Sequence, residues 1–198
     1  MPPATERVDG VGRGRPSVAA LGLLFAVAAI AYGLDQLGKA LITQNLREGE
    51  TVPLLGEVLQ LHFVTNSGAA FSLGSGFTWI LTIVSSGVVA LIVVFAARIR
   101  SLGWAAMFGL VLGGAVGNLT DRLFRPPGFG MGHVVDFIQV WGFPAIFNIA
   151  DIAVVCGMAL FILLSLRGIR LDGSRIPRAG TEHEPAESPV AAPDRAGD

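Results

Sequence analysis

The chain has 198 residues, a formal net charge of −1 and a mean hydropathy of +0.63; 52% of its residues are hydrophobic and 15% are charged. A soluble domain carries roughly 25% charged residues, so this composition is typical of a membrane protein, and the near-zero net charge argues against binding to nucleic acid. The single cysteine, Cys156, excludes an internal disulfide and argues against a cysteine-based metal cluster. We interpret it as a small packing residue within an apolar run.

The first predicted element is a membrane-spanning helix. Residues 1–16 are polar and are expected to be disordered, whereas Ser17 to Leu34 is uncharged and apolar over a length that can cross a bilayer. The helical pattern continues through Asp35-Gln-Leu-Gly-Lys39. That spacing places Asp35 and Lys39 on one helical face, where they can pair. The simplest interpretation is a solvated pair at the exit from the membrane.

A strand is predicted between the first two spans. Val58 to Val64 is rich in β-forming residues and is bounded by Gly56 and by Asn66-Ser-Gly68. His62 lies within this segment with no second histidine or cysteine nearby, so we interpret it as a strand residue and not as a metal ligand.

Three further apolar segments predict three more spans. Thr78 to Ala97 is the second, and Ser101 to Thr120 is the third, whose five glycines predict close helix packing and a central, enclosed position. Residues 121–143 are predicted to form a loop that contains two prolines. Pro144 to Leu166 is the fourth span, so the chain is predicted to be an all-α polytopic membrane protein with four transmembrane helices.

The distribution of basic residues predicts the orientation. Nine Lys and Arg residues flank the ends of the spans that carry both termini, and four flank the opposite ends. The positive-inside rule therefore places the N-terminal tail, 1–16, and the C-terminal tail, 169–198, in the cytoplasm. We expect both tails to be disordered around a membrane domain at 17–168. Residues 43–77 and 121–143 then share the outer face.

Three carboxylates, Asp121, Asp136 and Asp151, lie at or near the ends of apolar runs on that outer face. Acids in such places are costly unless they are solvated, paired or used in function. Asn118 precedes Asp121 by three residues and Asn148 precedes Asp151 by three, so each amide is predicted to share a helical face with its carboxylate and to donate to it.

The acids admit several chemistries. Two carboxylates held close together cannot both ionise readily, so one acid can act as a base toward a water while the other polarises a carbonyl, as in aspartic peptide hydrolysis. Clustered acids can also bind Mg²⁺ for phosphoryl chemistry or relay protons in a transporter. Ser85-Ser-Gly87 favours a serine protease less, because no histidine lies on a partner helix to act as its base.

Five collinear blocks carry a family resemblance across roughly residues 20–166. They are Asp35-Gln-Leu-Gly-Lys39, Asn66-Ser-Gly-Ala-Ala-Phe-Ser72, Gly113-Gly-Ala-Val-Gly-Asn-Leu-Thr-Asp-Arg122, Val134-Val-Asp-Phe137 and Phe147-Asn-Ile-Ala-Asp151. In these blocks the chain resembles the lipoprotein signal peptidases (signal peptidase II), which are bacterial membrane aspartic proteases.

The resemblance implies a four-helix bundle of the bacterial inner membrane with a small extracytoplasmic β-cradle and outer loop, and it implies no cofactor or metal. The family's catalytic pair falls on Asp136 and Asp151. Its supporting and substrate-side residues fall on Asn66, Asn118, Asp121, Arg122 and Asn148, and its pair at the exit of the first helix, to which we assign a scaffold role, falls on Asp35 and Lys39.

The implied substrate is a prolipoprotein whose lipobox cysteine already carries a diacylglyceryl group, with cleavage just before that cysteine. We expect a monomer that contacts membrane lipid and no nucleic acid. The segment 123–133 is several residues longer than in the family's commonest form, which an outer loop tolerates.

Overall fold

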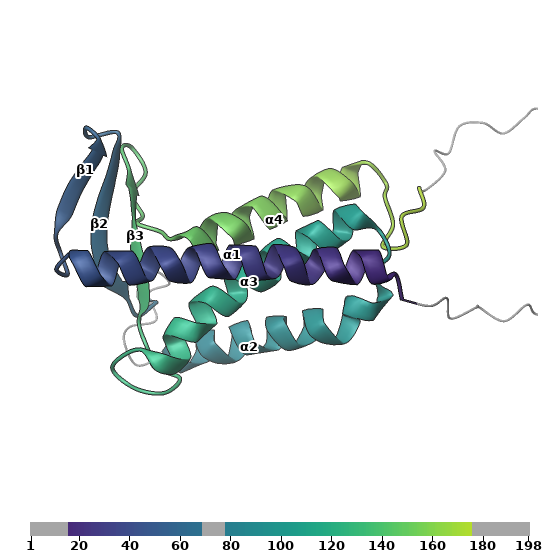
Figure 1. The fold of residues 1–198 in the computed structure, drawn as a ribbon, viewed down its shortest axis with the longest axis horizontal. Helices are drawn as coiled ribbons and strands as arrows, with labels where there is room; N and C mark the ends of the chain where they lie inside the picture. Colours follow the sequence, from purple (N-terminus) through teal and green to yellow (C-terminus); the bar gives the residue numbers. More distant parts are fainter. Residues whose placement is uncertain (1–15, 69–77, 176–198) are drawn as a thin grey trace, which may run out of the picture.

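The computed structural model describes residues 16–68 and 78–175 (Figure 1). Its long helices are α1 (Val18–Asn45), α2 (Thr78–Phe95), α3 (Leu102–Phe124) and α4 (Ile149–Leu166), and the short 3-10 helix η3 (Ala96–Arg98) extends α2. Its strands are β1 (Thr51–Leu55), β2 (Leu59–Asn66) and β3 (Val134–Val140). Within the described ranges, all four long helices are apolar enough to cross a membrane. The predicted architecture of four spans and a small sheet is confirmed.

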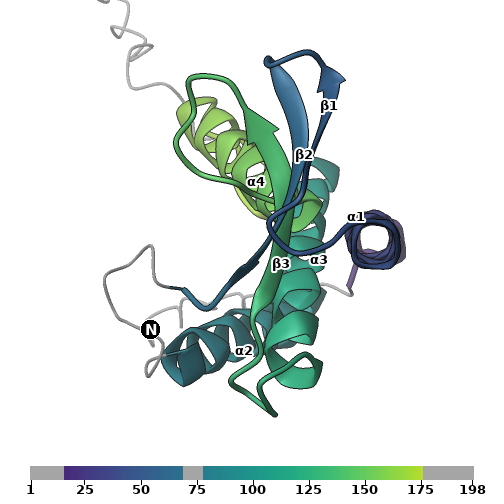
Figure 2. The same cartoon turned by 90° about the vertical axis from the view of Figure 1, so that its left-hand side faces the viewer.

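Helix α3 is the centre of the bundle, packed against the other three helices (Figures 1 and 2). Glycines make this packing possible: a Cβ on Gly109 would lie 2.6 Å from the Leu24 carbonyl oxygen of α1, and one on Gly114 would clash with the Ala150 carbonyl of α4. In the most apolar stretch of α3, 44% of the residues are buried, compared with 17% to 28% in the corresponding stretches of the other helices. The prediction that the third span is the most enclosed is confirmed.

The three strands form an antiparallel sheet in the order β1-β2-β3 across one end of the bundle, which we call the sheet end (Figures 1 and 2). The first and last described residues lie at the opposite end (Figure 1). In the register of β2 and β3, Val64 pairs with Asp136 and Asn66 pairs with Val134. The sheet therefore brings Asn66 beside Asp136. Asp136 belongs to a segment that was predicted to be a loop, 121–143, but it lies in strand β3.

Helix boundaries differ from the predicted ones where tertiary contacts decide them. Helix α1 runs to Asn45, six residues beyond Lys39, the last residue of the predicted helical pattern, and its buried polar residues Asp35 and Lys39 do not end it. Helix α4 begins at Ile149 and not at Pro144, because Phe147 remains extended to form a bridge with Ile138 of β3. The predicted strand 58–64 is shifted to Leu59–Asn66.

Residues at the end opposite the sheet also differ from expectation. Residues 169–175, assigned from sequence to the tail, pack on the start of α3: Trp104 Nε1 donates to the Ile169 carbonyl at 3.0 Å, and the backbone N–H of Ser101 donates to Leu171 at 3.0 Å. The remainder of both tails lies outside the described residues. Cys156 is exposed on α4, so its expected packing role is wrong. His62 lies in β2 as predicted, and its Nδ1 atom lies 3.0 Å from Gln139 Oε1.

Candidate active site

An open cavity of about 240 Å³ lies where the sheet meets the helices. Side chains from β2, α2, α3, β3 and α4 line it, so segments far apart in sequence converge there. The lining residues are Asn66, Gly68, Leu81, Ser85, Asn118, Arg122, Val134, Asp136 and Asp151. Of the blocks identified in the sequence, only residues 69–72 fall outside the described ranges.

Asp136 is buried in β3 with both carboxyl oxygens occupied. Asn66 Nδ2 donates to Oδ2 at 2.9 Å, and Asn148 Nδ2 donates to Oδ1 at 2.6 Å. The pKa of Asp136 is raised from an ordinary 3.8 to about 6: burial is the main cause and the charge of Asp151 adds to it, while hydrogen bonds from Asn66 and Asn148 and the charge of Lys39 oppose the rise. A carboxyl with this pKa can hold or release a proton near neutrality.

Asp151 lies in the first turn of α4, where the helix N-terminus favours a negative charge. It forms a capping box with Asn148: the Asp151 N–H donates to Asn148 Oδ1 at 3.0 Å, and the Asn148 N–H donates to Asp151 Oδ2 at 3.1 Å. The other carboxyl oxygen, Oδ1, accepts from Asn118 Nδ2 at 2.9 Å. Asp151 is therefore held at both oxygens, as Asp136 is.

The amides are paired crosswise between the two carboxylates. Asn118 Nδ2 reaches Asp151, and Asn148 Nδ2 reaches Asp136, while Asn148 also donates to Asn118 Oδ1 at 3.1 Å. The prediction that each amide donates to the carboxylate three residues later is wrong. Asn148 is the N-cap of α4 and not a residue within the helix, so its amide group is free to point across to β3.

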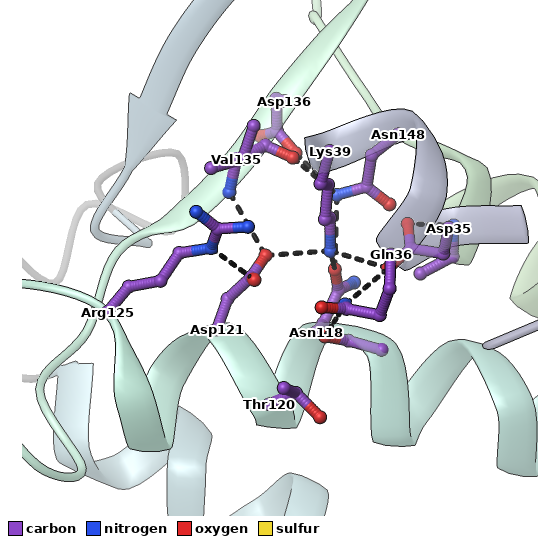
Figure 3. Close-up of polar contacts among 12 residues, drawn as sticks. Asp35, Gln36, Lys39, Asn118, Thr120, Asp121, Arg125, Val135, Asp136 and Asn148 are labelled. Carbon is purple, nitrogen blue, oxygen red and sulfur yellow. Dashed lines mark hydrogen bonds and ion pairs between the residues drawn. The ribbon is translucent and has the colours of Figure 1, made fainter. Parts of the chain in front are cut away.

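Asp121 does not line the cavity and belongs instead to a buried cluster centred on Lys39 (Figure 3). Lys39 Nζ lies 2.7 Å from Asp121 Oδ2, 2.8 Å from Asp35 Oδ2 and 3.0 Å from Asn118 Oδ1. The side chains of Asp35 and Lys39 are both 0% exposed, so the interpretation as a solvated pair is wrong. We call Asp35, Lys39, Asn118 and Asp121 the lysine cluster.

Two partners of the lysine cluster were not identified from the sequence. Arg125 Nε lies 2.5 Å from Asp121 Oδ1, and Gln36 Nε2 donates to Asp35 Oδ2 at 3.1 Å and to the Gly117 carbonyl at 3.2 Å. The four-residue spacing of Asp121 and Arg125 on one helix predicts such a pair, whereas nothing in the spacing of Gln36 indicates its contact with α3.

Arg122 brings a positive charge to the cavity wall. The residue is 8% exposed, and within the described ranges its buried Nη1 atom has no hydrogen-bond partner. A buried donor without a partner costs free energy, so this atom is suited to an acceptor that arrives with a ligand.

Comparison with known proteins identifies one family. A family model described as signal peptidase (SPase) II matches residues 27–167. A lipoprotein signal peptidase of Leifsonia xyli subsp. xyli is 58% identical over 163 residues, covering 82% of this chain and 76% of that protein, and one of Rhodococcus jostii is 48% identical over 77% of each chain. A solved bacterial membrane enzyme is 27% identical with a TM-score of 0.67, covering 77% of this chain and 97% of its own.

Proposed function

The chain belongs to the signal peptidase II family of aspartic peptidases, and on that premise we propose that it removes signal peptides from prolipoproteins with Asp136 and Asp151 as its catalytic pair. The observation that carries this proposal is that the two carboxylates border one cavity at the sheet end of the bundle, each with amide N–H groups donating to both of its oxygens. Such fixed carboxylates can hold a water between them.

The two acids differ in a way that supports separate roles. The pKa of Asp136 is raised to about 6, chiefly by burial, so this carboxyl is the one that carries a shared proton. Asp151 lies at a helix N-terminus, which favours its anionic form. In the proposed reactive state Asp136 is protonated and Asp151 is ionised.

The hydrolysis then needs only these two groups and water. Asp151 accepts a proton from water as the oxygen attacks the scissile carbonyl carbon, while Asp136 donates its proton to the carbonyl oxygen. The resulting gem-diol collapses: one hydroxyl returns its proton to Asp136, the C–N bond breaks, and the proton held by Asp151 passes to the leaving nitrogen. Both carboxyls regain their starting states.

The neighbouring polar residues have positioning and binding roles in this proposal. Asn66 and Asn148 fix the carboxyl of Asp136, and Asn118 fixes that of Asp151. The unpaired Nη1 of Arg122 supplies a donor for a carbonyl oxygen of the substrate backbone. Asp121 serves the lysine cluster and does not touch the substrate.

The proposed substrate is a prolipoprotein whose lipobox cysteine carries a diacylglyceryl group, and the proposed cleavage site directly precedes that cysteine. Two acyl chains anchor a peptide stably in a bilayer and hold the scissile bond near the membrane surface. The carboxylates lie at the sheet end of four candidate spans, which matches that depth. With both termini in the cytoplasm, as the basic residues favour, this end is extracytoplasmic.

Turnover of a synthetic lipobox peptide by the purified protein tests the proposal. The diacylglyceryl-modified peptide should be cleaved before its cysteine in buffer containing EDTA, and the same peptide without the lipid should be cleaved far more slowly. Loss of activity in EDTA with rescue by Mg²⁺ would favour metal chemistry. Cleavage at another bond, or none, would refute the assigned activity.

A further inference from the structure

Lys39 is completely buried, and its three N–H donors are matched by three acceptors, one of which is not a carboxylate. Besides Asp35 and Asp121, its ammonium donates to Asn118 Oδ1 at 3.0 Å (Figure 3). A pair needed only to tie α1 to α3 would be complete without this third contact. Lys39 itself does not line the cavity, so it cannot touch the substrate directly.

The contact with Lys39 fixes which way the Asn118 amide faces. A lysine ammonium has only donors, so the Asn118 amide must turn its oxygen toward it. The N–H₂ group of Asn148, whose Nδ2 lies 3.1 Å from Asn118 Oδ1, requires the same orientation. The Asn118 N–H₂ group is thereby directed to Asp151 Oδ1, at 2.9 Å. A reversed amide would set two donors against the cation and an oxygen against the carboxylate, which is unfavourable at every contact.

The same arrangement extends to the second carboxylate. Asn118 Oδ1 accepts from both Lys39 and Asn148, and the nitrogen of Asn148 also donates to Asp136 Oδ1 at 2.6 Å. The buried ammonium of Lys39 is therefore connected to both Asp151 and Asp136 through the hydrogen bonds of the two amides. The other charged groups near Asp136 are Asp151 and Arg122, which line the cavity beside it.

We propose that Lys39 is a positioning residue for the reaction, acting through Asn118: its ammonium orients the amide that holds Asp151 and stabilises the amide pair that reaches Asp136. This role goes beyond a scaffold and rests on the proposed catalytic pair. A scaffold role predicts that Lys39 affects stability alone, whereas an orienting role predicts a loss of turnover in protein that remains folded.

The double variant Asp35→Asn/Lys39→Met separates the two roles, because it removes one buried charge of each sign. The introduced amide at position 35 can still accept from the Ala150 N–H, which Asp35 Oδ1 now does at 2.9 Å. Asp121 keeps Arg125 at 2.5 Å and the Val135 N–H at 3.2 Å. We expect a near-wild-type melting temperature, a loss of roughly 10–100-fold in kcat and little change in KM. This is the pattern expected of a residue that orients a reacting group without contacting the substrate.

Two further readouts are sensitive to the orienting role. Removing the Lys39 charge removes one influence that lowers the pKa of Asp136, so the alkaline limb of the pH–rate profile, where Asp136 loses the proton that it must donate, should move to higher pH. Lys39→Arg keeps a cation that only donates, so it should retain the position of that limb even if it melts lower. The matched control is Gln36→Leu, which alters the same contact between α1 and α3 without touching Asn118, and it should leave the profile unchanged.

A double-mutant cycle with Asn118→Ala decides whether Lys39 acts through the amide. If it does, Asp35→Asn/Lys39→Met should cost at most about threefold in kcat once Asn118 is alanine, because the group it orients is gone. An equal fold-loss in both backgrounds, or a folded double variant with wild-type kcat and pH profile, would overturn the proposal. Wild-type turnover by Asp136→Asn or Asp151→Asn would instead remove the catalytic pair on which it rests, so the two failures are distinguishable.

Discussion

Replacing Asn148 with serine should separate two roles that one side chain combines. Its oxygen accepts from the Asp151 N–H at 3.0 Å as the N-cap of α4, and its amide nitrogen donates to Asp136 Oδ1 at 2.6 Å. Serine keeps an oxygen that can cap the helix but has no nitrogen to reach Asp136. Alanine removes both groups, so serine compared with wild type isolates the amide, and alanine compared with serine isolates the cap.

The expected magnitudes follow from these contacts. Losing one positioned donor next to a reacting group lowers kcat by roughly 10²–10³. The loss of a buried hydrogen bond to a carboxyl destabilises both variants by about 1.5–3 kcal/mol. Loss of the cap adds about 1 kcal/mol in Asn148→Ala alone. The two variants should therefore share a similar kcat, with the alanine variant the less stable by about 1 kcal/mol.

Steady-state turnover of the diacylglyceryl lipobox peptide, measured beside the melting temperature in the same detergent, provides the comparison. The positioning role predicts that Asn148→Ser is folded and slow, with KM nearly unchanged. A wild-type kcat in Asn148→Ser, accompanied only by a lower melting temperature, would show that Asn148 is a core polar residue and would refute the reasoning.

Three other perturbations have defined outcomes. Asn118→Ala should lower kcat more than it raises KM, because the amide donates to Asp151 and not to Asp121 as the sequence suggested; a change in KM alone would contradict this. The pKa of Asp136 is higher in the folded state, at about 6 against 3.8, so the stability that this group contributes is present below pH 4 and is lost as the pH rises through 6. Asp136→Asn should therefore be more stable than wild type at pH 8, by at most roughly 3 kcal/mol, and equal to it at pH 4; the same difference at both pH values would exclude this titration. A reporter fused at Ser101 should read cytoplasmic and one inserted at Glu48 extracytoplasmic, whereas the inverted pattern would place the carboxylates on the wrong face.

The spans could be predicted from the sequence because a bilayer imposes a length and a hydropathy on any helix that crosses it. Their ends could not, because contacts between elements set them. Helix α1 passes through Asp35 and Lys39 because partners on α3 and α4 neutralise and bind these side chains. Strand β3 was not predicted, because four of its seven residues are buried and no alternation marks it.

The candidate side chains were found from their chemistry and order, but their pairing was not. Helical spacing assigned Asn148 to Asp151, and that assumption fails because Asn148 precedes the helix and caps it. The role of Lys39 likewise depends on Asn118, 79 positions away, which no local pattern relates to it. Which amide holds which acid is thus a property of the packed structure.

Turnover of the diacylglyceryl lipobox peptide in EDTA by wild type, Asp136→Asn and Asp151→Asn, each confirmed as folded by its melting transition, tests the central claim most directly. An amide keeps the shape of either carboxyl but cannot accept a proton from water or deliver one to the substrate. Each substitution should therefore lower kcat by at least roughly 10²–10⁴-fold. Cleavage by either folded variant at the wild-type rate would contradict the assignment of Asp136 and Asp151 as the catalytic pair.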